Sequence, residues 1–461
     1  MTYKVHRRQF VLSSTAFHLP GWRSQELGAS VVLSHDPDLK VRSEGETVVL
    51  GEALLGDSTG RFVTIAGGEL RLDTAGLLAV YYAVTPDGVV ATSSPALARR
   101  ILAAERDTLE LRWSGAVRRP SGKLLNWFPS PASSSIGVNR LLPDQALNLS
   151  TGEVTRVGRP FEPFDDVEEA SRILADQIGE ATAALPDGRL CISLTAGLDS
   201  RVILAGLVAS GRPFDAVTQQ IGDSAAAADD IRIARELASR YGARHTVMRP
   251  RRTRVELIER RAAHTDGSYV DADDLLVPNG QYGFLQDGVV VVRGGCFEIG
   301  RRQLHDIVGD VEFDAAGAAV FAERFGCSRD THPSAVEALE RWAAWRADHP
   351  NGLDPADSFF LDQRLGGWFA SLEQNLDAYP GRSINPANSY TAFTALLGSR
   401  DPDVLRSGEI QKRAAERLCC GILETPLNPS ASTRPHDRVR RVLARHASRT
   451  IRRLRGVRQF A

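Results

Sequence analysis

The pattern of apolar residues divides the chain into two parts with different periods. From Phe10 to about residue 160, short alternating apolar runs are broken by Gly, Pro, Asp and Ser, which is typical of β-strands. Such runs occur at 30–33, 47–50, 61–65, 78–82 and 88–92, and a hairpin is expected between residues 135 and 154. From residue 167 onward, buried-looking strands alternate with helical spacing. The pattern therefore predicts a strand-rich N-terminal part followed by an α/β part.

The second part begins as a series of strands and helices in alternation. Strands are expected at 190–194, 214–219, 245–248 and 289–292, and helices at 167–185, from Arg201, and at 230–241. Such a βαβ series predicts a parallel sheet with ligands at its carboxyl edge. Beyond residue 304 the spacing is largely helical, with helices at 313–323, 334–348 and 392–397. The Pro-rich segment 158–166 has no period and is the expected linker, which gives domains 1–160 and 167–430.

Composition restricts the class of protein. The chain has 461 residues, of which 43% are hydrophobic and 25% charged, as expected for a globular protein. Its 56 basic and 57 acidic residues nearly cancel, so attraction to nucleic acid or to a membrane must be local. The five cysteines form no C-x-x-C motif, and no apolar run is long enough to cross a bilayer, so a cytoplasmic location is expected. The local exception is the tail 434–461, a predicted basic amphipathic helix that could contact an anionic partner.

The most distinctive stretch lies between the strand at 190–194 and the helix that follows it. Gly197 allows close approach of the main chain, and the start of a helix directs free N–H groups at an anion. Thr195 and Ser200 can donate hydroxyl hydrogen bonds to phosphate oxygens. Asp199 would repel a phosphate unless a cation lay between them, which indicates Mg²⁺. The stretch is neither a Walker A loop nor a dinucleotide fingerprint, and an ordinary glycine turn is the alternative.

Residues 194–200 read Leu-Thr-Ala-Gly-Leu-Asp-Ser, which resembles the PP-loop of ATP pyrophosphatases and, among them, the L-S-G-G-L-D-S of asparagine synthetases. The resemblance implies a PP-loop synthetase domain with a helical C-terminal part, preceded by an α+β glutaminase-like domain of the Ntn-hydrolase kind. It also implies ATP and Mg²⁺ as cofactors, with Asp199 as catalytic residue and metal ligand. The residues that it assigns to ATP and its pyrophosphate are Ser193, Leu194, Thr195, Ala196, Gly197 and Ser200, with Asp230 near the adenosine. Alternatively, Asp230 is a helix N-cap.

A second loop, residues 293–300, follows the strand at 289–292. It resembles the second pyrophosphate loop of the same family, which assigns Gly294 and Gly295 to pyrophosphate and makes Glu298 a catalytic candidate. The alignment puts Phe297 where the family has a metal-facing aspartate. An ordinary glutamate at a helix start is the alternative for Glu298.

Three further positions are candidates by their place in the chain. Arg364 and Arg382 fall where related synthetases build the pocket for the acyl substrate, although a salt bridge is an equal alternative for Arg382. The family often ends with a lysine that neutralises pyrophosphate. Residues 424–429 contain none, which leaves Lys412 as the candidate.

Thr2 stands where class II glutaminases have the nucleophilic cysteine, so we expect no glutaminase activity. The expected function is that of an ATP-dependent, AMP-forming carbon–nitrogen ligase of the asparagine synthase type. It would adenylate a small-molecule or peptide carboxylate, which ammonia or an amine then attacks, as in β-lactam synthetases and lasso-peptide cyclases. Two alternatives stay open: a PP-loop tRNA-modifying enzyme, and a non-catalytic nucleotide-binding scaffold. A homodimer is also left open.

Overall fold

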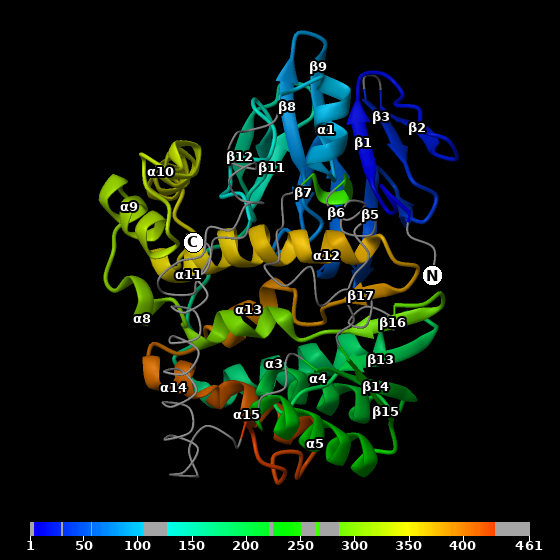
Figure 1. The fold of residues 1–461 in the computed structure, drawn as a ribbon, viewed down its shortest axis with the longest axis vertical. Coiled ribbons are helices and arrows are strands. Elements are labelled where there is room, and N and C mark those ends of the chain that lie inside the picture. The colour runs from blue at the N-terminus through cyan, green and yellow to red at the C-terminus, as the bar shows by residue number, and fades with distance from the viewer. Residues whose placement is uncertain are drawn as a thin grey trace, which may run out of the picture.

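Two antiparallel sheets form the N-terminal part of the protein, as Figure 1 shows. The computed structural model describes residues 4–28, 31–56, 58–105, 127–220, 225–249, 263–266 and 285–428. One sheet has the order β10-β8-β9-β1-β3-β2, with strands Asn139–Arg140, Tyr81–Thr85, Gly88–Thr92, Phe10–Ser13, Val31–His35 and Arg23–Leu27. The other has the order β12-β11-β7-β6-β5-β4, with strands Val154–Arg156, Gln145–Asn148, Glu69–Leu72, Thr59–Ala66, Thr47–Leu54 and Val41–Glu44.

Alternation of side chains builds the core between these sheets. Phe10, Leu12 and Leu33 from one sheet pack in one cluster with Leu50 and Val63 from the other. Helix α1 (Pro95–Leu102) packs on β8 and β9. The strand-rich prediction is confirmed. The hairpin lies further along the chain than expected, because β11 pairs with β12, whereas β10, within the expected first arm, pairs with β8.

One expected strand begins later than the sequence suggests. The apolar run at 78–82 becomes strand only from Tyr81. The reason is Asp73, a buried carboxylate that accepts hydrogen bonds from the main-chain N–H groups of Phe62, Ala75, Leu77 and Leu78. These bonds hold the residues before Tyr81 in a turn, so their N–H groups cannot join a ladder.

The second part is built on a parallel sheet of five strands. Its order is β15-β14-β13-β16-β17, with strands Arg244–Met248, Phe214–Gln219, Arg189–Ser193, Val289–Val292 and Arg382–Ile384. The four strands predicted from the sequence are confirmed. The fifth strand, β17, was not predicted, because only three residues of it pair with β16. The mixed α/β fold, with antiparallel sheets followed by a parallel sheet and helices, is therefore as expected.

Helices cover the sheet and form the rest of the chain. Those near the parallel sheet are α3 (Val167–Ala183), α4 (Leu198–Ala209), α5 (Ala225–Arg240), α13 (Tyr390–Leu396) and α15 (Glu409–Leu418). The others are α8 (His305–Val308), α9 (Ala315–Arg324), α10 (Pro333–Asp348), α11 (Pro355–Phe359), α12 (Ala370–Asp377) and α14 (Pro402–Ser407). A 3₁₀ segment, η1 (Gly295–Arg301), follows β16, and a π-helical segment, η2 (Phe360–Phe369), joins α11 to α12. This long helix crosses between the antiparallel sheets and the parallel sheet (Figure 1).

A buried ion network ties the two parts of the chain together. Arg346 of α10 is fully buried and donates to both carboxylate oxygens of Asp362 at 2.7 Å. It also donates to Asp144, which precedes β11, at 2.8 and 2.9 Å. The indole N–H of Trp342 donates to Asp362 at 2.8 Å. The carboxylates raise the pKa of Arg346, so the guanidinium is charged at every working pH.

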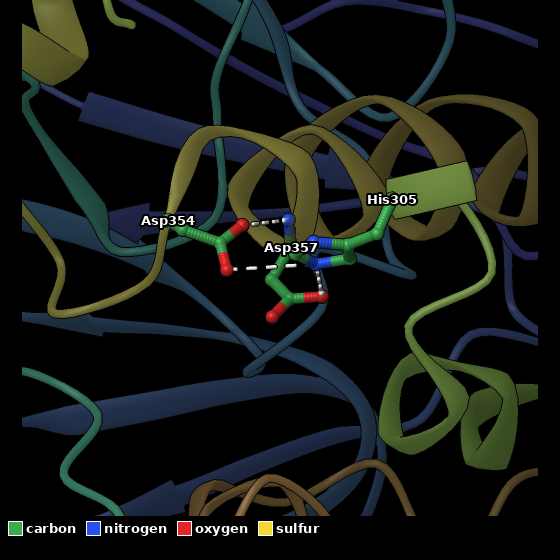
Figure 2. Close-up of side chains that lie close together, drawn as sticks. All are labelled: His305, Asp354 and Asp357. Atoms are coloured by element: carbon green, nitrogen blue, oxygen red, sulfur yellow. Dashed lines mark hydrogen bonds and ion pairs between the residues drawn. The ribbon is translucent and has the colours of Figure 1, made fainter. Parts of the chain in front are cut away.

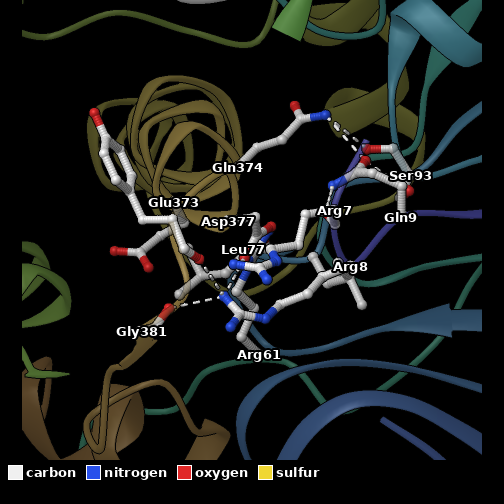
Figure 3. Close-up of polar contacts among 12 residues, drawn as sticks. Arg7, Arg8, Gln9, Arg61, Leu77, Ser93, Glu373, Gln374, Asp377 and Gly381 are labelled. Atoms are coloured by element: carbon white, nitrogen blue, oxygen red, sulfur yellow. Dashed lines mark hydrogen bonds and ion pairs between the residues drawn. The ribbon is translucent and has the colours of Figure 1, made fainter. Parts of the chain in front are cut away.

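A second polar cluster joins the residues before β1 and strand β6 to the end of α12 and the turn after it (Figure 3). Arg61 of β6 donates to Asp377 at 2.6 Å, and Arg8 donates to the carbonyl of Gly381 at 2.8 Å. Gln374 donates to the side chain of Gln9 at 3.3 Å. The apolar core is also continuous across the two parts, because Leu54 and Trp127 belong to the same cluster as the parallel sheet.

The chain between residues 157 and 166 has neither helix nor strand, and Asp166 caps α3 by accepting from the N–H groups of Glu168 and Glu169. The division into domains 1–160 and 167–430 stays a prediction. Thr2 and the tail 434–461 lie outside the described residues. Within the residues described, no helix is long and apolar enough to cross a membrane.

Candidate functional site

The strand order of the parallel sheet has one reversal point. Along the chain, β14 and β15 are added on one side of β13, whereas β16 and β17 lie on its other side. At such a reversal point, the loops that follow the two central strands, here β13 and β16, generally leave toward opposite faces of the sheet, and a crevice between them is expected. In open parallel sheets, ligands bind in such a crevice, outside the carboxyl ends of the strands. The two loops here are 194–197 and 293–295, both nominated from the sequence.

The first loop is short because α4 begins at Leu198 rather than near Arg201. The helix starts with Gly197 at its N-cap, and no side chain caps the amides of its first turn. These N–H groups lie at the positive end of a helix of 12 residues, at the reversal point of the sheet. This geometry suits a phosphate or another small anion.

The polar side chains of the loop hold its own shape. The hydroxyl of Ser200 accepts from the N–H of Thr195 at 3.1 Å and lies 3.0 Å from the Thr195 hydroxyl. The Thr195 hydroxyl accepts from the N–H of Gly197 at 3.1 Å. Leu194 and Ala196 are buried in the core, so only their main chain can face a ligand, and Ser193 ends β13. In this conformation the two hydroxyls organise the loop instead of facing outward.

Asp230 also supports the loop. It lies on α5 and its carboxylate accepts from the N–H of Ala196. Burial raises the pKa of Asp230, and the bond from Ala196 opposes that rise. Asp230 is not the N-cap of this helix, because α5 begins at Ala225. Asp230 instead fixes the main chain immediately before the helix start.

The carboxyl of Asp199 has a strongly shifted pKa. Its Oδ2 accepts from Nη2 of Arg301, the last residue of η1, whereas its Oδ1 is buried without a hydrogen bond. Burial raises the pKa of Asp199 to about 7; Arg301 opposes the rise and Glu298 adds to it. Such a perturbed carboxyl in a crevice is typical of functional sites.

The second loop packs directly against the first. A Cβ on Gly294 would lie 3.0 Å from the carbonyl carbon and oxygen of Asp199, so glycine is required for the close approach of the two loops. A Cβ on Gly295 would overlap the ring of Phe369. Protein packing is thus a sufficient reason for glycine at both positions, and their assignment to pyrophosphate stays a prediction.

The second loop brings one carboxylate, that of Glu298, to the site. Phe297 is fully buried, and its carbonyl accepts from Gln411 at 3.1 Å, so this position offers no carboxylate to the crevice. Glu298 is half-buried and has neither a hydrogen bond nor an ion pair with a side chain that the structure describes. Asp199 thus lies between a negative charge, that of Glu298, and a positive one, that of Arg301.

One divalent cation fits this donor set. The unpartnered Oδ1 of Asp199 and the carboxylate of Glu298 are hard oxygen ligands, and Mg²⁺ bound with phosphates typically needs only one or two protein carboxylates. Phe297, between Cys296 and Glu298, supplies no further carboxylate. Arg301 supplies a permanent positive charge in the same place.

Lys412 is brought to the same region by α15. The start of this helix touches the start of α4, because a Cβ on Gly408 would lie 2.6 Å from the side chain of Leu198. Lys412 is half-buried, and its ammonium makes no hydrogen bond or ion pair within the described part of the chain. The segment after α15 also returns to the loop, since the N–H of Asn428 donates to the carbonyl of Ala196 at 3.3 Å.

The two arginines nominated for a substrate lie elsewhere. Arg382 is the first residue of β17, at the opposite end of that strand from the loops, and pairs with Glu52 at 3.5 Å. The salt-bridge alternative is thus the one that the structure contains. Arg364 lies on η2 with its guanidinium 3.6 Å from the centre of the Trp368 ring. Such stacking of a guanidinium on an aromatic ring is a packing contact within the protein.

Sequence reasoning missed Arg301, the partner of Asp199. A weak signal existed, because Arg301 comes three residues after Glu298 and so lies one helical turn further along. It also missed Arg201, which is fully buried and donates to the carbonyls of Ile422 and Thr425 at 2.9 and 2.8 Å. An arginine in the apolar run of α4 gave no hint of that distant contact.

Comparison with known proteins adds little to this description. No protein-family model matches the sequence, and no curated protein matches it. Among solved structures, the chain is similar to the U34-tRNA thiolase NcsA from Methanococcus maripaludis, which was solved with its [4Fe-4S] cluster. The likeness covers 43% of this chain and 77% of that chain, with 13% sequence identity and a TM-score of 0.21. A likeness this weak carries no argument about fold or function.

Proposed function

We propose that the protein is an ATP-dependent, AMP-forming ligase that adenylates a carboxylate at the crevice between β13 and β16 and then forms an amide. The observation that carries the proposal is the uncapped start of α4 at the reversal point of the parallel sheet, beside a buried carboxyl with a raised pKa. The resemblance of residues 194–200 to the asparagine synthetase PP-loop supplies the reaction class.

In this proposal, ATP lies with its phosphates against the first turn of α4. The free amides of that turn and the guanidinium of Arg301 bind the phosphate oxygens. The substrate carboxylate attacks the α-phosphorus, which gives an acyl-adenylate and pyrophosphate. Ammonia or an amine then displaces AMP. The chain lowers the barrier by orienting the reactants and by stabilising negative charge on the pyrophosphate.

A magnesium ion would be held by Asp199 and Glu298 and would neutralise phosphate charge. Arg301 stabilises the same charge and, unlike a metal ion, is present before the nucleotide binds. Asp230 keeps the N–H of Ala196 from pointing at the ligand and fixes the loop. Lys412, on the helix whose start contacts the start of α4, is a further candidate to bind phosphate oxygens.

Exchange of labelled pyrophosphate into ATP tests the proposal, with Mg²⁺ and a panel of small and peptide carboxylates. We expect exchange that depends on one class of carboxylate, and a loss of at least about a hundredfold in Asp199→Ala and in Arg301→Met, because each change removes charge stabilisation near the transferred group. Asp176→Asn, an exposed carboxylate on α3 that pairs with Arg172, is the matched control and should keep full activity. Exchange that survives both site variants would refute the assignment.

A non-catalytic nucleotide-binding protein is the second candidate. Phe297 is buried where a metal ligand is expected, and Asp199 is already paired with Arg301. Measured ATP binding without any conversion to AMP, under every condition and with every carboxylate, would favour this candidate.

A further inference from the structure

A cluster of metal-ligating side chains lies apart from the crevice, at the start of α11 (Figure 2). His305 of α8, Asp354 at the N-cap of α11, and Asp357 in its first turn place three ligand atoms within 4.8 Å of one another. These atoms are the imidazole Nε2 and one oxygen of each carboxylate. Asp357 is almost fully buried, with 6% of its surface exposed.

One cation already occupies the centre of this cluster. The guanidinium of Arg302 donates to Asp354, lies 3.2 Å from Oδ2 of Asp357 through its Nε, and donates from the same Nε to Nε2 of His305 at 2.9 Å. Arg302 adopts a left-handed main-chain conformation with a φ of 49°, which is uncommon for a residue other than glycine. The protein therefore accepts some backbone strain in the residue whose guanidinium holds these three acceptors.

Arg302 does not satisfy both contacts of the His305 ring nitrogen. Its Nε2 lies 2.9 Å from the N–H of Arg302, for which it must be an acceptor, and 3.2 Å from Oδ1 of Asp357, for which it must be a donor. A single ring nitrogen cannot do both. If Nε2 accepts from Arg302, it faces Oδ1 of Asp357 as one acceptor against another, and a cation bonded to both atoms would satisfy them.

The distances from His305 to the two carboxylates match the ligand spacing around a metal ion. Nε2 of His305 is 3.2 Å from Oδ1 of Asp357 and 3.5 Å from Oδ2 of Asp354. Ligands about 2.0–2.1 Å from a tetrahedral zinc ion lie about 3.3–3.4 Å apart. The N–H of Asp357 donates to the other oxygen of Asp354 at 3.0 Å and so holds that carboxylate in place.

A path for the ion and for a fourth ligand exists. Arg302, Asp354 and Asp357 line a pocket of about 620 Å³, including its open mouth, together with Phe161, Thr394 and Ser399. Such a pocket admits the ion and a water molecule or a small ligand to the remaining coordination position.

We propose that His305, Asp354 and Asp357 form a binding site for a divalent transition-metal ion, with zinc as the best fit, and that Arg302 takes the place of the ion in the metal-free chain. An imidazole with two carboxylates favours such ions over Mg²⁺ and Ca²⁺, which prefer oxygen ligands alone. A divalent ion that replaces Arg302 leaves the two carboxylates paired with positive charge, so no carboxylate is left buried without a cation. The site is independent of the proposed nucleotide chemistry.

Titration of the full chain with Zn²⁺ and with Co²⁺, in the absence of nucleotide, tests the site. We expect one ion per chain, and the intense visible absorption of tetrahedral Co²⁺. Asp357→Asn and His305→Gln should each lower the affinity by about a hundredfold or more, since each removes a ligand. Arg302→Gln should raise the affinity by about tenfold, because it removes the competing cation.

Two control variants show whether zinc binds at this cluster or at another carboxylate. Asp306→Asn changes an exposed carboxylate beside His305 that pairs with Arg406, and should leave zinc affinity unchanged. Asp199→Asn should also leave it unchanged, which separates this site from the crevice. Misfolding would weaken zinc binding, so the higher zinc affinity expected for Arg302→Gln cannot arise from it. Absence of zinc binding by the wild-type chain, binding that survives loss of both His305 and Asp357, or weaker binding by Arg302→Gln would overturn the proposal.

Discussion

Replacing Asp199 with asparagine should show that the charged form of this buried carboxylate lowers the free energy of unfolding at neutral pH. The pKa of this carboxyl rises from 3.8 to about 7 because burial and Glu298 disfavour the charge more than Arg301 favours it. In the unfolded chain the same group titrates near its ordinary value. Between these two values the folded protein keeps a proton that the unfolded chain has released. The free energy of unfolding must therefore fall as the pH rises from about 4 to about 7.

The size of this effect follows from the shift. At about 1.4 kcal/mol for each tenfold change, the rise to about 7 corresponds to about 4 kcal/mol in total. Water still reaches 19% of the Asp199 side chain, so about 2–4 kcal/mol is the range to expect. Asparagine has nearly the same shape and does not titrate. The difference in unfolding free energy, wild type minus Asp199→Asn, should thus become more negative with pH and level off above about pH 8.

Urea denaturation of both proteins at intervals between pH 5 and pH 8 measures this difference. We expect it to change by about 2–3 kcal/mol over that range, because part of the transition lies below pH 5. Asp176→Asn, which changes an exposed carboxylate, should give a flat difference. A flat difference for Asp199→Asn, or one that becomes more positive with pH, would mean that the pair with Arg301 dominates over burial, and would refute the reasoning.

Three further changes test other parts of the structure. Arg346→Met should lower the free energy of unfolding by about 3–5 kcal/mol in urea, since it leaves the buried carboxylate of Asp362 without a cation; a loss under 1 kcal/mol would contradict this. Gly352→Ala should lose about 1–3 kcal/mol more than Gly158→Ala, because both have a φ near 90° but only the first would press a Cβ into a main-chain oxygen of the linker; equal losses would contradict this. The free energy of unfolding of the wild-type protein should fall by about 3 kcal/mol between pH 6.5 and pH 4, and His264→Gln should abolish this fall. Burial lowers the pKa of His264 to about 4, so the unfolded chain takes up the proton first; equal acid sensitivity of both proteins would contradict this.

The candidate site shows where sequence reasoning succeeds and where it stops. The strand at 289–292 and the loop after it were predicted because an all-valine run can only be a buried strand, and parallel strands end at one edge. The partner of Asp199 was not predicted, because η1 had to turn Arg301 back toward α4, and no local pattern encodes that direction. The roles of Gly294 and Gly295 were assigned to pyrophosphate, although packing against Asp199 and Phe369 explains both residues.

By itself, the sequence determined the order of strands and helices, the parallel sheet and the loop 194–200, because periodicity and turn residues act locally. Only the tertiary structure decided which charges meet. It paired Arg382 with Glu52 rather than with a substrate, and it surrounded Arg302 with His305, Asp354 and Asp357. Ion pairs and ligand clusters join residues that are distant along the chain, and their geometry depends on how whole helices pack. Local patterns carry no information about that packing.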